Sequence, residues 1–138
     1  MYDSLHALLS FTGWTLLLGL GVILFRVSQV LAGKKKSNEF PAWIQHGSDF
    51  YWRLNRAHLN CLENLPVFAV LVFAGAILDP DQAIFDLLAW IVFAARILQT
   101  CAHLSGGGVW PVNVRFTGFF LQYVSFGSML LLLLKSLP

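Results

Sequence analysis

Charged side chains are scarce in this chain. Only 12% of its 138 residues are Asp, Glu, Lys or Arg, whereas 57% are hydrophobic. A water-soluble domain needs a polar shell and has about 25% charged residues. The deficit indicates that lipid surrounds most of the surface, which argues against an ordinary soluble enzyme. The net charge of +2 gives no sign of a nucleic-acid partner, and we expect none.

Cysteine is equally scarce, and its two copies, Cys61 and Cys101, both lie in apolar segments. Disulfide frameworks serve small secreted domains with weak cores, so we expect two buried thiols instead. The sequence also lacks a glycine-rich phosphate loop, a His/Cys cluster at metal-ligand spacing and a Ser/His/Asp arrangement, and it predicts no metal site. The first apolar stretch has no basic residues before it and is too long for a signal peptide, so we expect it to remain as a membrane span.

Four segments are long and apolar enough to cross a bilayer, whose hydrocarbon core requires about 20 helical residues. Their ranges are residues 5–31, 57–78, 83–104 and 112–134. The sequence therefore predicts an all-α integral membrane protein, a bundle of four transmembrane helices that forms a single domain over residues 1–138. Asp81 is expected to cap the third helix, and Pro111 is expected in the first turn of the fourth.

The loops between these segments differ in charge. Lys34, Lys35 and Lys36 occupy the first loop, whereas the second loop is purely acidic. Because loops rich in Lys and Arg stay in the cytoplasm, the first and third loops are predicted to be cytoplasmic. An even number of spans then places both termini on the non-cytoplasmic side.

The second segment carries a stripe of polar residues. Its members are Arg53, Arg56, Asn60 and Glu63. Their spacings of three, four and three residues align them on one helical face. Each ionisable group at membrane depth costs at least about 2.5–3.5 kcal/mol, so such groups face a bundle interior and meet a partner. We interpret the stripe as the wall of a polar cavity; the alternative is purely structural, with Glu63 paired to Arg56 or to Arg96 on the third segment.

The other segments add polar groups at helical spacing. The further candidates are Arg26 in the first segment, Arg96, Gln99 and His103 in the third, and Arg115 and Tyr123 in the fourth. Taken singly, three of these residues have a simpler explanation. His103 is then an interfacial residue, and Arg26 and Arg115 are anchors that reach lipid phosphate. Together these residues place more guanidinium groups than carboxylates in one region. This excess indicates an anionic ligand, because Arg donates bidentately to carboxylates and phosphates. Asn60 and Gln99 add amides suited to a peptide-like ligand.

Residues 53–66 read RLNRAHLNCLENLP. This stretch resembles the signature of the MAPEG superfamily, the membrane-associated proteins of eicosanoid and glutathione metabolism, which reads R-A-x-x-N-x-x-E followed closely by a proline. The resemblance extends over the whole chain, with four helices, a cytoplasmic first loop and an arginine at the start of the fourth helix. The sequence looks like a bacterial relative of microsomal glutathione transferase and leukotriene C synthase, which implies a place in the bacterial inner membrane.

The resemblance implies a homotrimer that binds glutathione, as co-substrate, at sites between protomers. Arg56, Asn60 and Glu63 match the family's glutathione contacts on the second helix. Arg53 matches a position that is also often Arg. Arg26 matches an arginine that reaches glutathione from the neighbouring protomer.

Arg115 matches the arginine that stabilises the glutathione thiolate, because a guanidinium beside the sulfur lowers the pKa of the thiol. Other positions depart from the family's pattern. Gln99 or His103 stands where the best-known enzymes have tyrosines on the third helix. Phe116 and Phe119 replace a serine and a tyrosine of prostaglandin E synthase, so prostaglandin isomerase activity is not expected.

The sequence thus predicts a membrane-embedded glutathione transferase, with or without peroxidase activity, that acts on hydrophobic small molecules dissolved in the membrane lipid. The alternative is a non-catalytic lipid- or glutathione-binding protein of the same fold. A different anionic thiol or a lipid headgroup is a third occupant compatible with the arginine cluster.

Overall fold

The computed structural model describes residues 3–41 and 44–138, and over those residues it contains helices and no strand. The helices are α1 (Asp3–Leu31), α2 (Asp49–Leu78), α3 (Gln82–Ser105) and α4 (Val109–Lys135). Each of them is long and apolar enough to cross a membrane. The predicted all-α bundle of four membrane-spanning helices is confirmed.

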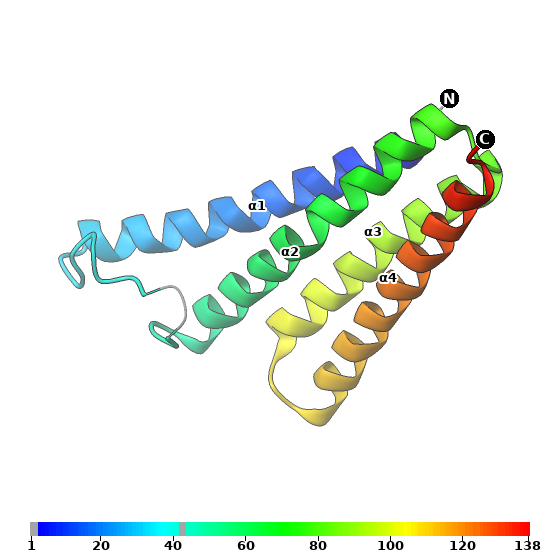
Figure 1. Ribbon diagram of the computed structural model, residues 1–138. Helices are drawn as coiled ribbons and strands as arrows, with labels where there is room; N and C mark the ends of the chain where they lie inside the picture. The colour runs from blue at the N-terminus through cyan, green and yellow to red at the C-terminus, as the bar shows by residue number, and fades with distance from the viewer. Residues whose placement is uncertain (1–2, 42–43) are drawn as a thin grey trace.

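The four helices splay apart along their length (Figure 1). The end of the bundle that holds the α2–α3 turn also holds both termini, and the helices converge there. At the other end, the α1–α2 loop and the α3–α4 loop point away from each other. The backbones of α1 and α4 approach each other nowhere in the described chain. Both termini therefore lie at one end of the bundle, while the side of the membrane that they face stays a prediction.

Local capping sets where α2 and α3 begin. Ser48 caps α2, because its hydroxyl accepts a hydrogen bond from the Tyr51 N–H at 3.2 Å. The helix therefore begins well before the predicted span, which started at residue 57. Asp81 caps α3 as predicted, with its carboxylate accepting a hydrogen bond from the Ile84 N–H at 3.3 Å.

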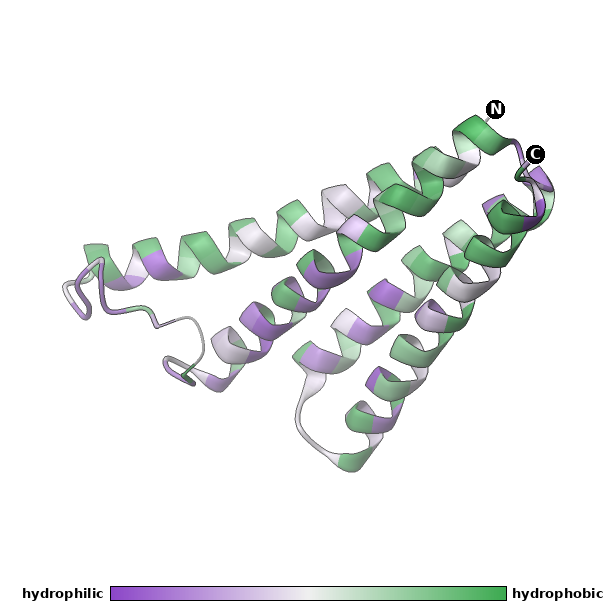
Figure 2. Cartoon of the chain, viewed as in Figure 1, coloured by the Kyte–Doolittle hydropathy of each residue, from purple (hydrophilic) through white to green (hydrophobic). Residues whose placement is uncertain are grey.

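Phenylalanine rings form the centre of the apolar core. The ring centroid of Phe68 in α2 lies 5.5 Å from that of Phe11 in α1 and 6.0 Å from that of Phe126 in α4. Large apolar side chains also cover the outside, where Leu31 and Ile77 are 82% and 81% exposed, as a surface in lipid requires. Figure 2 shows the hydrophilic residues of α2 gathered in its half nearer the α1–α2 loop. Polar groups therefore concentrate where the helices splay.

The two cysteines differ in environment, and both thiols are free. Cys61 is fully buried, as predicted. The prediction for Cys101 is wrong, since this side chain is exposed. It shares the outer face of α3 with Leu98, one turn earlier, whereas its neighbours Thr100 and Ala102 are buried against the other helices.

Close packing of α2 against α3 depends on Gly75, and we expect Gly75→Ala to destabilise the bundle. A Cβ atom added there would lie 2.5 Å from Cε1 of the fully buried Phe85 ring, so the ring must shift. The expected loss is about 1–3 kcal/mol, the usual cost of overpacking. Thermal unfolding of the purified protein in detergent measures it.

Gly13→Ala is the matched control, because a Cβ atom at Gly13 meets nothing within 4 Å. Alanine also favours a helix over glycine by up to about 1 kcal/mol. The Gly13 variant should therefore be at least as stable as the native protein. Equal melting temperatures for the two variants would contradict the packing argument.

Candidate functional site

Three helices meet at Asn60, His103 and Arg115, in the splayed half of the bundle. In this Asn60–His103–Arg115 cluster, Nη1 of Arg115 lies 3.2 Å from Nδ1 of His103. Nε2 of His103 lies 3.0 Å from Nδ2 of the Asn60 carboxamide. Pro111 lies in the first turn of α4, as predicted, one turn before Arg115. The structure thus brings together three of the residues that the sequence singled out, one from each of α2, α3 and α4.

Hydrogen-bond chemistry fixes the protonation of this cluster. A guanidinium has donors and no acceptor, so Nδ1 of His103 must accept the bond from Arg115. The ring is then neutral, and its one proton lies on Nε2. The structure places Nδ2 of Asn60 beside this N–H, so two donors face each other. Rotating the carboxamide by 180° brings its oxygen to the ring, so that Nε2–H donates to Asn60 and the NH₂ group turns away. His103 holds Arg115 without cancelling its positive charge.

The other members of the α2 stripe lie around this cluster. Arg56 and Glu63 are exposed, while Arg53 is half-buried. The Nε atom of Arg53 is buried and has no hydrogen-bond partner among the described residues. Over the same part of the chain, the one ion pair within 4.0 Å is His6 with Asp3, so the pairing of Glu63 with Arg56 considered above is absent. These side chains are left free for a ligand.

Beneath the cluster lies a buried amide network centred on Arg96, whose side chain is 1% exposed. Its Nη1 and Nη2 atoms each donate at 2.6 Å, to Oε1 of Gln99 and Oε1 of Gln122 respectively. Asn64 Nδ2 also donates to Oε1 of Gln122, at 2.8 Å. Of the two roles left open for Glu63, the structural pairing with Arg96 is not formed within the described chain, since no ion pair joins them within 4.0 Å. Amide oxygens accept from Nη1 and Nη2 of Arg96, its buried Nε has no partner there, and Glu63 lies on an exposed face of α2.

The amide network places Arg96 and Gln99 below the site, with Gln99 only 4% exposed. Within a single chain, both side chains are too deeply buried to contact a ligand directly. Gln99 acts on the site from below, since its Nε2 donates to the backbone carbonyl of Arg115 at 3.3 Å. Arg96 contributes an unpaired positive charge in a region of low dielectric constant, which favours an anion nearby.

Tyr123 lies apart from the cluster, in a groove of about 290 Å³ between α2 and α4. Glu63, Asn64 and Tyr123 give this groove its polar groups. The remaining lining residues are Val67, Leu71, Phe126, Gly127 and Leu130. The groove therefore has one polar end beside the α2 stripe and one apolar end deeper in the membrane.

Arg26, like Tyr123, lies outside the Asn60–His103–Arg115 cluster. Its Nε donates to the hydroxyl of Tyr51 at 3.0 Å, near the end of α1 that splays away from α4. A contribution of Arg26 to the site of a neighbouring protomer stays a prediction.

Sequence analysis missed one member of the amide network, Asn64. The sequence could have indicated its role, because Asn64 is an uncharged polar residue inside an apolar segment, and such residues form hydrogen bonds between helices in membranes. Its partner Gln122 is 58 positions away in the chain, and helical spacing does not predict which helix faces which.

Comparison with known proteins identifies the family of the chain. The model of the MAPEG family matches residues 4–135, a range that includes every candidate site residue. No curated protein matches the chain. The family match covers nearly the whole chain, and its members are membrane proteins of eicosanoid and glutathione metabolism. The chain belongs to the MAPEG family.

Proposed function

We propose that the protein is a membrane-embedded glutathione transferase that conjugates or reduces hydrophobic electrophiles. The observation that carries this proposal is the state of Arg115, whose guanidinium is held by a neutral His103 and keeps its full charge. A single bond to His103 leaves the other N–H groups of Arg115 free for a ligand. Membership of a family of glutathione metabolism supports glutathione as that ligand.

Arg115 would act on the thiol of glutathione. A guanidinium beside sulfur stabilises the thiolate and lowers the pKa of the thiol, so the nucleophile forms at neutral pH. The thiol proton leaves to water, and the sulfur electron pair forms a bond to the electrophilic carbon as the leaving group departs. The neutral His103 fits this role, because a carboxylate in its place would cancel the charge that the thiolate needs.

The α2 stripe matches the rest of glutathione, which carries two carboxylates, an ammonium group and two peptide units. Arg53 and Arg56 suit the carboxylates, since guanidinium groups bind them bidentately. Glu63 suits the ammonium group. The NH₂ group of Asn60, turned away from His103, suits a peptide carbonyl.

A hydrophobic electrophile would reach the sulfur from the lipid. Phe116, Phe119 and Phe120 are exposed on α4 in the described chain, and the groove beside Tyr123 is apolar at its deep end. Arg56 and Glu63 are exposed in a single chain, which supports a homotrimer whose neighbouring protomer completes the site. A bacterial inner membrane, with both termini on the non-cytoplasmic side, remains the proposed location.

Arg115→Ala should abolish thiolate formation while the protein remains folded. We expect the ultraviolet absorbance of the glutathione thiolate with the native protein and its loss in the variant. The turnover number with chlorodinitrobenzene should fall by about 10²–10³-fold, as for other losses of a preorganised charge partner. Arg115→Lys keeps the positive charge but loses the planar, bidentate guanidinium, so its turnover number should lie between those of the native protein and Arg115→Ala.

Two results would contradict the proposal at different levels. If glutathione binds the native protein without forming a thiolate, the protein is a non-catalytic binder of the same fold. If glutathione does not raise the melting temperature at all, the binding proposal is also wrong.

His103 should position Arg115, and two substitutions separate this role from mere packing. Gln can accept a hydrogen bond from Arg115, whereas Phe fills the same space without an acceptor. His103→Phe loses the hydrogen bond to Arg115, which is worth about 1–1.5 kcal/mol. The pKa of the glutathione thiol should then rise, and the midpoint of the pH–rate profile should move about 1 pH unit higher. His103→Gln should keep the native midpoint. An unchanged midpoint in a folded His103→Phe protein would remove His103 from the mechanism.

A further inference from the structure

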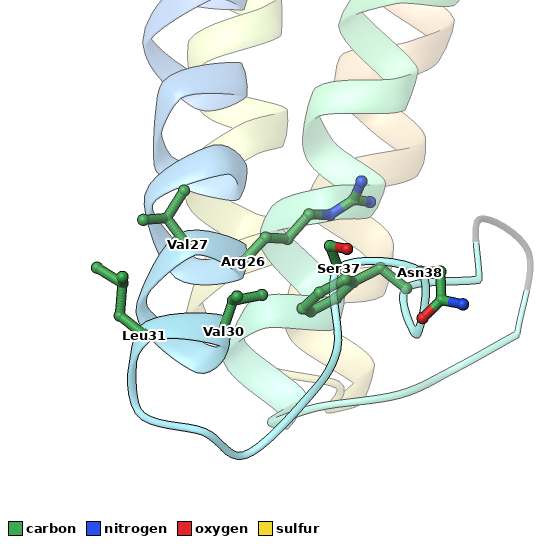
Figure 3. Close-up of a pocket in the computed structure, with 7 residues that line it drawn as sticks. Arg26, Val27, Val30, Leu31, Ser37 and Asn38 are labelled. Atoms are coloured by element: carbon green, nitrogen blue, oxygen red, sulfur yellow. The ribbon is translucent and has the colours of Figure 1, made fainter.

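A second polar cavity lies at the end of α1, between that helix and the loop that follows it (Figure 3). Its volume is about 420 Å³. It is lined by Arg26, Val27, Val30, Leu31, Ser37, Asn38 and Phe40. This cavity, called here the Arg26 cavity, shares no lining residue with the Asn60–His103–Arg115 cluster.

Two cations lie near the ring of Phe40, which lines the Arg26 cavity: Arg26, itself a lining residue, and Lys35, which is not. Cζ of Arg26 lies 5.7 Å from the centroid of the Phe40 ring, and Nζ of Lys35 lies 5.5 Å from the same centroid. The hydroxyl of Tyr51 holds the guanidinium in place by accepting a bond from Nε. The ring faces attract both cations, yet the cations repel each other.

No described carboxylate lies within 4.0 Å of either cation. Glu39, the nearest acidic residue in sequence, uses its carboxylate to accept a bond from the backbone N–H of Lys36 at 2.9 Å. Arg26, which lines the cavity, and Lys35, which lies beside its Phe40 wall, therefore have no described carboxylate as counter-ion within 4.0 Å, and an anion bound there would relieve their repulsion.

The opposite wall of the Arg26 cavity is apolar and faces outwards. Val27 and Leu31 are 46% and 82% exposed, and Val30 is 37% exposed. Figure 3 shows Val27 and Leu31 on the outer side of α1, while the Arg26 side chain extends from α1 towards α2. This apolar wall lies on the last turns of α1, a helix long and apolar enough to cross a membrane.

We propose that the Arg26 cavity binds the phosphate headgroup of an anionic phospholipid. Arg26 and Lys35 neutralise the phosphate, and Ser37 and Asn38 supply a hydroxyl and an amide as hydrogen-bond donors. The acyl chains lie along the exposed apolar face of α1. A small soluble anion would use only the polar half of the cavity, whereas a phospholipid uses both halves. The proposal does not rest on the transferase activity, because the Arg26 cavity shares no lining residue with the Asn60–His103–Arg115 cluster.

The test uses the full chain in nanodiscs of phosphatidylcholine alone or with part of it replaced by phosphatidylglycerol. We expect the native protein to melt several degrees higher in the discs that contain phosphatidylglycerol. Arg26→Gln and Lys35→Gln should each lose most of this difference. Lys135→Gln is the matched control, since it removes the same charge from an exposed residue in the last turn of α4, at the other end of the bundle, and it should keep the difference.

Several outcomes would overturn the proposal. The melting temperature of the native protein could be the same in both discs, or Lys135→Gln could lose as much as Lys35→Gln, which would indicate general charge attraction. An equal shift from inorganic phosphate in phosphatidylcholine discs would indicate a free anion. Stabilisation by glutathione that depends on Arg26 would assign this arginine to the thiol site. If Arg26→Gln does not fold, Lys35→Gln decides alone.

Discussion

The guanidinium of Arg96, bonded to the amide oxygens of Gln99 and Gln122, determines how the polar half of this bundle is assembled. Between helices in lipid the hydrophobic effect gives little drive, so close packing and polar bonds specify which faces meet. A buried charge that loses its partners costs about 3–5 kcal/mol. Because Gln122 belongs to α4 and also accepts from Asn64 of α2, this one cation sets the register of three helices.

The geometry of the candidate site follows from that register. Gln99 is one turn beyond Arg96, and it donates to the backbone carbonyl of Arg115. His103 is one further turn along the same face, and it accepts from the side chain of Arg115. Arg115 is therefore held at its backbone and at its guanidinium by two residues of α3, and Arg96 bonds directly to one of them, Gln99. A side chain fixed in this way needs little reorganisation when a negative charge forms beside it.

Local sequence features were enough to predict the four spans, from their length and hydrophobicity, the Asp81 cap, from its residue type and position, and the polar face of α2, from helical spacing. They did not predict which faces meet. Glu63 was a candidate partner of Arg96, because a buried guanidinium needs a carboxylate or a carbonyl, and the oxygens of two neutral amides take that place. Cys101 was expected to be buried because its segment is apolar, but in lipid an apolar segment has an exposed face as well as a buried one.

The separation of Glu63 from Arg96 has an electrostatic consequence for the site. Had these two groups paired, the charge of Arg96 would be cancelled at the point where the helices enclose it. Amides bind the guanidinium without neutralising it, so Arg96 and Arg115 both contribute positive potential to the same half of the bundle. In a region of low dielectric constant that potential is weakly screened, and it acts on an anion at the cluster even though Arg96 does not touch it. The same carboxylate, left exposed on α2, remains free to bind a cationic group of the ligand.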